Sequence, residues 1–134
     1  VMRRAAAENW IEVVRLPTRV ISVGNLQAGG TGKTPLVIRI AKEAVERGLQ
    51  VAILSRGYQS LWERTGGVIA PFEKSPSPAL CGDEVALIHD QVPEAWIGVG
   101  ADRSAQFEAL TSLAQLKGER SFDLVVLDDG LQHW

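Results

Sequence analysis

A glycine-rich segment that joins an apolar run to a helix-forming stretch constrains this chain more than any other feature of its sequence. Residues 27–34 read Gln-Ala-Gly-Gly-Thr-Gly-Lys-Thr and come shortly after the apolar residues 20–23. In such a unit the glycines let successive backbone N–H groups point inward at phosphate oxygens, and the N-terminus of the following helix adds its dipole. The sequence therefore predicts a phosphate-binding P-loop.

The predicted P-loop departs from the general pattern G-x-x-x-x-G-K-[ST] at one position, where Gln27 replaces the first glycine. The part that contacts nucleotide phosphates is intact and consists of Gly29, Gly30, Thr31, Gly32, Lys33 and Thr34. We expect Lys33 to reach the β- and γ-phosphates and the Thr34 hydroxyl to ligate Mg²⁺. The alternative is an ordinary glycine-rich turn with a solvated lysine, which accounts less well for the flanking strand and helix.

The composition excludes several classes of protein. The chain has 134 residues, a formal charge of −2 and 46% hydrophobic residues, which is typical of one globular domain and not of a polycation that binds nucleic acid. We therefore expect no nucleic-acid partner. The single cysteine, Cys81, excludes an internal disulfide and a cysteine-based zinc site. No apolar run approaches the ~20 residues that span a bilayer.

Short apolar runs alternate with amphipathic stretches, which predicts an α/β fold with helices on both faces of a parallel sheet. We expect strands at residues 20–23, 51–54, 68–69, 96–99 and 124–127, and helices at residues 34–47, 84–90 and 102–117. Three prolines predict a loop over residues 70–80. Because the sequence stops soon after the last predicted strand, we expect a P-loop domain that is truncated at its C-terminus.

Residues 1–19 combine basic and apolar side chains, because the arginines outnumber the glutamates and Trp10 lies close to several aliphatic residues. This composition predicts an amphipathic helix. Such a helix either docks on its own domain or lies at the surface of an anionic membrane. We therefore divide the chain into a basic, apolar helix at residues 1–19 and a P-loop domain at residues 20–134.

Two consecutive aspartates, Asp128 and Asp129, follow the last apolar run. A strand at residues 124–127 would deliver them to the carboxyl edge of the sheet, where α/β proteins bind ligands. Because a P-loop requires an acidic residue there to hold Mg²⁺ directly or through water, we predict that both serve the metal. An ordinary Asp-Gly turn is the alternative.

Three further polar residues are candidates for the same edge. Arg56 follows the second predicted strand, where it could stabilise charge on a transferring phosphate, grip an acidic substrate or remain a solvated turn residue. Asp83 precedes a predicted helix, either as its N-cap or as a carboxylate that orients or deprotonates an acceptor hydroxyl. His133 could contact a substrate or a metal ion.

Taken together, the order and spacing of five motifs resemble the tetraacyldisaccharide 4′-kinase family of lipid A biosynthesis. The motifs are Val23-Gly-Asn25, Gly29-Gly-Thr-Gly-Lys-Thr-Pro35, Ser55-Arg-Gly-Tyr58, Gly82-Asp-Glu84 and Asp128-Asp-Gly-Leu-Gln-His133. The resemblance covers nearly the whole chain from about Arg15 onward, and the missing first glycine of the P-loop is also typical of that family. It implies a kinase that uses Mg²⁺ to move the γ-phosphate of ATP to the 4′-hydroxyl of a tetraacyldisaccharide 1-phosphate.

The resemblance also implies roles for residues of this chain. Lys33 and Thr34 would hold phosphates and metal, Asp83 would activate the acceptor hydroxyl, and Arg56 would lie near the transferred phosphate. The residues that would serve the metal and its waters are Thr34, Glu84, Asp128 and Asp129. Those that would contact the lipid substrate are Tyr58 and His133.

Family members carry an apolar, basic N-terminal helix that docks on the cytoplasmic face of the bacterial inner membrane, and residues 1–14 resemble its remnant. The resemblance therefore implies a peripheral membrane protein, which we expect to be a monomer. In the family, the counterpart of Asp83 works with a histidine from the C-terminal part of the enzyme. We therefore expect residues 20–134 to be a partial catalytic domain, whose activity by itself stays open.

Two other functions remain open. A nucleotide-switched ATPase of the partition and division-site type uses a related loop, but such proteins carry a signature lysine at the position of Ala28. The third possibility is a non-catalytic remnant that binds a nucleotide without transferring its phosphate. Continuation of the natural gene into a second domain would favour the kinase, and a stop codon after Trp134 would favour the remnant.

Overall fold

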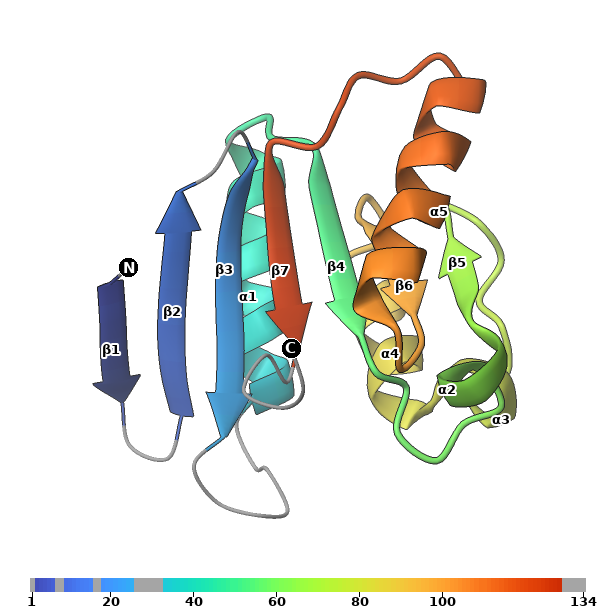
Figure 1. Cartoon of the computed structure of the whole chain (residues 1–134), viewed down its shortest axis with the longest axis horizontal. Coiled ribbons are helices and arrows are strands. Elements are labelled where there is room, and N and C mark those ends of the chain that lie inside the picture. The colour runs from blue at the N-terminus through green and yellow to red at the C-terminus, as the bar shows by residue number, and fades with distance from the viewer. Residues whose placement is uncertain (1, 7–8, 16–17, 26–32, 129–134) are drawn as a thin grey trace.

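The computed structural model describes residues 2–6, 9–15, 18–25 and 33–128 (Figure 1). The strands are β1 (Met2–Ala6), β2 (Asn9–Arg15), β3 (Arg19–Asn25), β4 (Val51–Ser55), β5 (Gly67–Ile69), β6 (Trp96–Val99) and β7 (Leu124–Asp128). The helices are α1 (Lys33–Glu46), α2 (Trp62–Thr65), α3 (Pro78–Cys81), α4 (Asp83–Gln91) and α5 (Arg103–Leu116).

The described strands form one sheet in the order β1-β2-β3-β7-β4-β6-β5. The four central strands, β3, β7, β4 and β6, are parallel to one another, whereas β1, β2 and β5 add antiparallel strands at the two edges. The last described strand in the sequence, β7, lies between β3 and β4 and pairs with both of them. The predicted α/β fold is therefore confirmed, with antiparallel additions that the sequence did not suggest.

Helices cover both faces of the parallel strands, as the alternation along each strand requires. On β7, Val126 packs on one face with α1 and α4, while Val125 packs on the other face with α5. Figure 1 shows α1 and α4 behind the sheet and α5 in front of it. The helix α1 buries Val37, Ala41 and Ala44, which lie three and four residues apart and so share one face.

The N-terminal segment corrects the prediction made for residues 1–19. Met2–Ala6 and Asn9–Arg15 are strands and not a helix, and β2 pairs antiparallel with β3 along its whole length. The β-branched residues Ile11, Val13 and Val14 favour a strand, and pairing supplies hydrogen bonds to a flank of β3 that would otherwise be an open edge. The division of the chain at residue 19 stays a prediction.

Two shorter elements were not expected from the sequence. The helical turn α2 follows β4, and the turn α3 begins at Pro78 inside the segment predicted as a loop. Proline favours the first turn of a helix as much as it favours a loop, so the prolines did not distinguish the two. None of the helices in the described part of the chain is long and apolar enough to cross a membrane.

The close approach of α5 to β6 generates a test of this packing. A Cβ atom added to Gly98 would lie 2.9 Å from Leu54 Cδ2 and 3.2 Å from Leu110 Cδ1. We expect Gly98→Ala to lower the free energy of unfolding by about 1–3 kcal/mol, because the helix must move away from the sheet. Urea unfolding measures this loss.

The control is Ser112→Ala, on an exposed position of α5. It should change the free energy of unfolding by no more than about 0.5 kcal/mol. Equal stability of the two variants would show that the spacing between α5 and the sheet is not tight.

Candidate active site

The polar residues predicted for the site gather at the carboxyl edge of the four parallel strands. The helices α1, α4 and α5 begin at this edge, so their N-termini direct positive dipole ends toward it (Figure 1). Such an edge favours anionic ligands.

Lys33 and Asp128 form a buried ion pair at the centre of this edge. Lys33 Nζ lies 2.9 Å from Asp128 Oδ1, and the two side chains are 5% and 1% exposed. Asp128 is brought there because it ends β7, where it pairs in register with Val23 of β3. Lys33 Nζ also lies 3.5 Å from Glu84 Oε1 at the start of α4. The structure thus brings together three residues that the sequence analysis had assigned to phosphate and metal.

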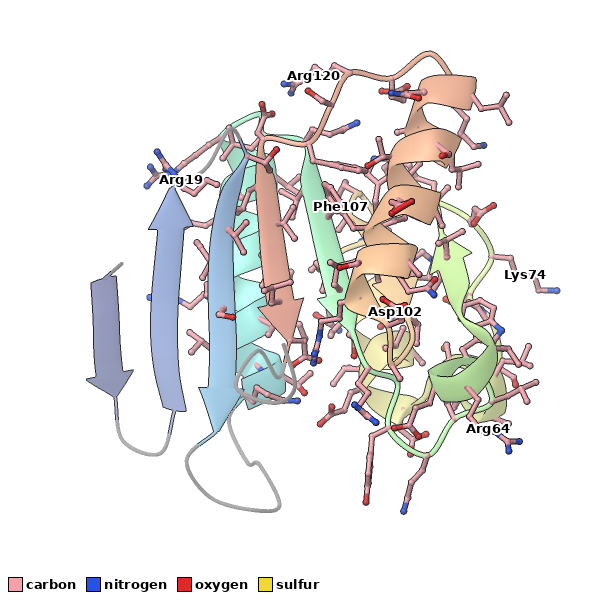
Figure 2. All side chains as sticks on the ribbon, in the orientation of Figure 1. Arg19, Arg64, Lys74, Asp102, Phe107 and Arg120 are labelled. Atoms are coloured by element: carbon pink, nitrogen blue, oxygen red, sulfur yellow. The ribbon has the colours of Figure 1, made fainter. Side chains whose placement is uncertain are left out.

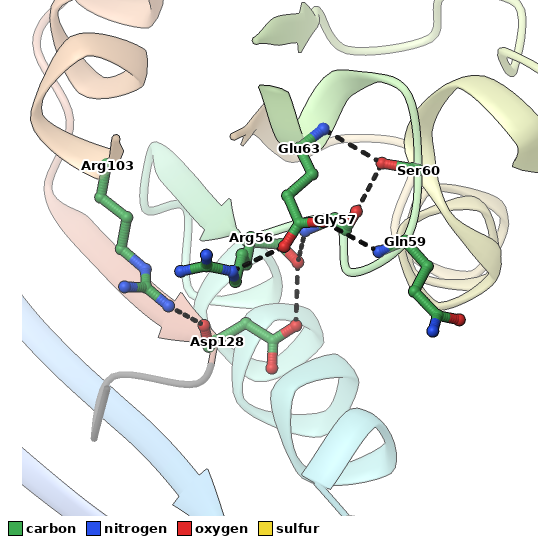
Figure 3. A network of polar contacts seen from close by, with 8 residues as sticks. Arg56, Gly57, Gln59, Ser60, Glu63, Arg103 and Asp128 are labelled. Carbon is green, nitrogen blue, oxygen red and sulfur yellow. Dashed lines mark hydrogen bonds and ion pairs between the residues drawn. The ribbon is translucent and has the colours of Figure 1, made fainter. Parts of the chain in front are cut away.

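Two residues that the sequence analysis did not assign hold Asp128 in place (Figure 3). Ser55 Oγ donates a hydrogen bond of 3.2 Å to Asp128 Oδ2, and Arg103 Nη2 donates one of 3.1 Å to the Asp128 carbonyl oxygen. Arg103 is only 4% exposed. The available signal was position, because Ser55 directly follows one predicted strand and Arg103 lies in the first turn of the predicted helix that follows another.

Thr34 presents a buried hydroxyl that has no hydrogen-bond partner within the described residues. A buried polar group without a partner costs free energy, which makes this oxygen a fitting ligand for a cation. No three histidine, cysteine or acidic side chains of the described residues come together as a metal site. That arrangement still suits Mg²⁺, which keeps several waters and takes one or two protein ligands together with substrate phosphates. Thr34 and Asp128 therefore fit Mg²⁺ bound with a nucleotide.

Arg56 directly follows β4 and forms an ion pair with Glu63 of α2. Arg56 Nε is 2.7 Å from Glu63 Oε2, and both side chains are largely buried. The two residues line an open pocket of about 640 Å³ between α2 and the start of α5. Figure 2 shows Arg64 on α2 and Asp102 at the start of α5, which also line it. Glu63 was not singled out by the sequence analysis.

Asp83 is the first residue of α4 and is exposed. The predicted N-cap role is wrong, because Gly82 occupies the N-cap position and no side chain of the described residues caps the helix. Gly82 has φ +100°, a conformation that favours glycine over residues with a Cβ. The Asp83 carboxylate is thus not used by its own helix and stands at the edge where Lys33 and Arg56 also lie.

The loop that follows β4 packs directly on the turn before α4. A Cβ atom on Gly57, which has φ +70°, would lie 2.4 Å from Val99 Cγ1 and 3.3 Å from the Cys81 carbonyl oxygen. Only glycine permits this contact. The glycines of the Ser55–Tyr58 and Gly82–Glu84 motifs therefore bring Arg56 and Asp83 to one place.

The remaining predicted residues divide into two groups. Tyr58 is described and is 70% exposed, on the loop between β4 and α2. The predicted residues that lie outside the described part of the chain are Gly29, Gly30, Thr31, Gly32, Asp129 and His133.

Comparisons with known proteins place these motifs in a family. The sequence model of LpxK, tetraacyldisaccharide-1-P 4′-kinase, matches residues 1–134. The chain is 42% identical over 121 residues to the tetraacyldisaccharide 4′-kinase of Pelobacter propionicus, covering 89% of this chain and 32% of that protein. It is 37% identical to the enzyme of the same name from Histophilus somni, covering 100% of this chain and 38% of that protein.

A solved structure is also similar. A crystal structure of LpxK from Aquifex aeolicus in complex with ATP has a TM-score of 0.64 and 31% sequence identity to this chain. The similarity covers 91% of this chain and 36% of that one. The chain thus spans about a third of the length of the relatives that it matches.

The buried ion pair generates a prediction about stability. We expect Asp128→Asn to lower the free energy of unfolding by about 3 kcal/mol, because it removes the counter-charge that lies 2.9 Å from the buried Lys33 ammonium. Urea unfolding in the absence of nucleotide measures the change. The control is Glu43→Gln, which removes an exposed ion pair with Arg47 and should cost less than about 0.5 kcal/mol. A stabilised Asp128→Asn variant would contradict the prediction.

Cys81, next to the Gly82–Glu84 motif, generates a prediction about pH. Burial raises the pKa of the Cys81 thiol, and the charge of Asp83 adds to the increase. The folded state therefore holds the thiol proton more tightly than the unfolded state does. The resulting stabilisation is fully present below the ordinary thiol pKa of about 8.5 and is lost as the pH rises above it.

We expect the free energy of unfolding to fall more steeply between about pH 8 and pH 10 in the unsubstituted chain than in Cys81→Ala. The difference in slope should not exceed about 1.4 kcal/mol per pH unit. Urea unfolding of both proteins at several pH values measures it. Parallel pH profiles would show that the thiol does not contribute.

Proposed function

We propose that this chain, which belongs to the tetraacyldisaccharide-1-P 4′-kinase family, is the nucleotide-binding part of an enzyme that phosphorylates the 4′-hydroxyl of a tetraacyldisaccharide 1-phosphate with ATP. The buried Lys33–Asp128 pair is the observation that carries the proposal. A lysine at the start of a P-loop helix and an aspartate at the end of the neighbouring strand are the parts that phosphoryl transfer requires. Family membership favours the kinase over the nucleotide-switched ATPase.

In the proposed reaction, ATP lies across the N-terminus of α1. Lys33 exchanges its contacts with Asp128 and Glu84 for the β- and γ-phosphate oxygens. Thr34 and Asp128 would hold Mg²⁺, with Glu84 and Asp129 as further groups for the metal and its waters. Bound there, Mg²⁺ would neutralise charge on the phosphate oxygens. Ser55 and Arg103 keep Asp128 in place while Lys33 moves.

Asp83 is proposed to accept the proton of the 4′-hydroxyl. The hydroxyl oxygen forms a bond to the γ-phosphorus, the bond from that phosphorus to the β–γ bridging oxygen breaks, and ADP leaves. The exposure of Asp83 at the start of α4 supports this role, because an acceptor from solution can reach its carboxylate. Arg56 is proposed to stabilise the charge on the transferring phosphate.

We also propose a location on the cytoplasmic face of the bacterial inner membrane, as a peripheral protein of lipid A biosynthesis. The names of the relatives support a tetraacylated substrate, and four acyl chains hold such a molecule in a bilayer. The enzyme must therefore meet its acceptor at the membrane surface, whereas ATP arrives from the cytoplasm.

The function is tested by following labelled γ-phosphate from ATP to a tetraacyldisaccharide 1-phosphate in detergent micelles, with the full-length gene product. We expect transfer by the unsubstituted protein and a loss of about 10²- to 10⁴-fold in Asp83→Ala, because the general base is removed. The matched control is Asp90→Ala, which removes an exposed aspartate from the other end of α4 and should transfer normally. Bound ATP without any transfer would refute the kinase.

A further inference from the structure

Glu63 stands out because each of its polar groups within the described structure has a definite partner. Its carboxylate accepts from Arg56 Nε at 2.7 Å through Oε2 and from the Gln59 backbone N–H at 3.1 Å through Oε1. Its backbone N–H donates to Ser60 Oγ at 3.3 Å, and its carbonyl oxygen accepts from the Ala101 N–H at 2.9 Å. A carboxylate held in this way has little freedom to move.

The backbone bond to Ala101 ties Glu63 to the elements that position Asp128. Ala101 lies in the connection between β6 and α5, and α5 begins with Arg103, whose guanidinium holds the Asp128 carbonyl oxygen. The Ser55 carbonyl oxygen accepts from the Gly100 N–H at 2.9 Å, so the ends of β4 and β6 are joined as well. Glu63 is therefore fixed relative to the Lys33–Asp128 pair although it lies on a separate helical turn.

Arg56 contacts Glu63 through one nitrogen only. A guanidinium has five N–H donors in a rigid plane, and the contact with Glu63 uses Nε. The terminal nitrogens Nη1 and Nη2 have no partner within the described residues. Figure 3 shows the far end of the guanidinium turned away from Glu63 and toward the side of the site where Arg103 and Asp128 lie.

The loop between Arg56 and Glu63 contains a residue in an unfavourable conformation. Gln59 has φ +62°, in the left-handed region that residues other than glycine rarely adopt. The Gln59 backbone N–H donates a hydrogen bond to Glu63 Oε1. A strained loop residue persists where its surroundings hold it, and the Glu63 carboxylate supplies that restraint.

We propose that Glu63 is a positioning residue for Arg56, which it holds by Nε so that the terminal nitrogens face the phosphate that is transferred. Glu63 does not touch the substrate and acts only through the arginine. Because the phosphate that Arg56 faces is the one that the proposed reaction transfers, this role rests on the proposed function. An arginine whose orientation is fixed before the reaction stabilises developing charge without reorganising.

The test compares the kcat and KM of transfer for the full-length gene product and three variants, Glu63→Gln, Arg56→Ala and the double variant. We expect kcat to fall about tenfold in Glu63→Gln and about a hundredfold in Arg56→Ala, with the KM for the lipid acceptor little changed. The double variant should match Arg56→Ala, because Glu63 has nothing to orient without the arginine. The control Glu108→Gln changes an exposed glutamate of α5 in the same way and should leave kcat unchanged.

Two outcomes would overturn the role of Glu63. One is a double variant whose losses multiply, which would mean that Glu63 acts independently of Arg56. The other is normal transfer by Glu63→Gln. If Glu63→Gln does not fold, Arg56→Lys carries the test, because a lysine ammonium cannot offer separate nitrogens to Glu63 and to phosphate. Arg56→Lys should then lose nearly as much as Arg56→Ala, and full activity would contradict the proposal.

Nucleotide binding separates this role from the proposed function, because it needs no lipid. We expect the preference for Mg-ATP over Mg-ADP to fall about tenfold in Glu63→Gln, with no additional effect of this substitution in the Arg56→Ala background. If this pattern holds but the unsubstituted protein transfers no phosphate, only the proposed function fails. If the unsubstituted protein transfers phosphate but Glu63→Gln and Arg56→Ala act independently, only the role of Glu63 is overturned and the proposed function stands.

Discussion

The ion pair between Lys33 and Asp128 is the interaction on which the arrangement of the site depends. It joins the first turn of α1 to the end of β7, two elements that are far apart in the sequence, and it does so where both side chains are almost fully buried. Burying one of these charges without the other would be costly, so each fixes the position of its partner. The contacts of Ser55, Arg103 and Glu84 are arranged around this pair.

In the proposed function, the same pair would allow a phosphate to bind without a large change in the fold. An ammonium group placed between two carboxylates is already surrounded by the negative charge that phosphate oxygens would supply. In the proposed reaction, a phosphate that replaced those carboxylates would require the lysine to move only its flexible side chain. The carboxylates would then be free to meet a cation, which replaces the positive charge that has moved away.

The sequence was sufficient to predict those parts of the structure that depend on the local periodicity of apolar residues and on local motifs. The four parallel strands, the helices α1, α4 and α5 and the position of Asp128 at a strand end follow from apolar runs and their spacing. The strands β1 and β2 were missed, because charge and one tryptophan were weighed above the β-branched residues. Glu63 and Arg103 were missed for another reason. Their roles depend on contacts with residues that the fold brings close, and the spacing of residues along the chain does not predict such contacts.

The position of β7 also has a consequence for how the chain is made. It is the last described strand to leave the ribosome, yet it lies between β3, which is synthesised about 100 residues earlier, and β4, which is synthesised about 70 residues earlier. Until it arrives, both of those strands expose a long row of unpaired backbone groups. The sheet therefore cannot close in the order of synthesis, and its centre is completed only after both neighbouring strands have been made.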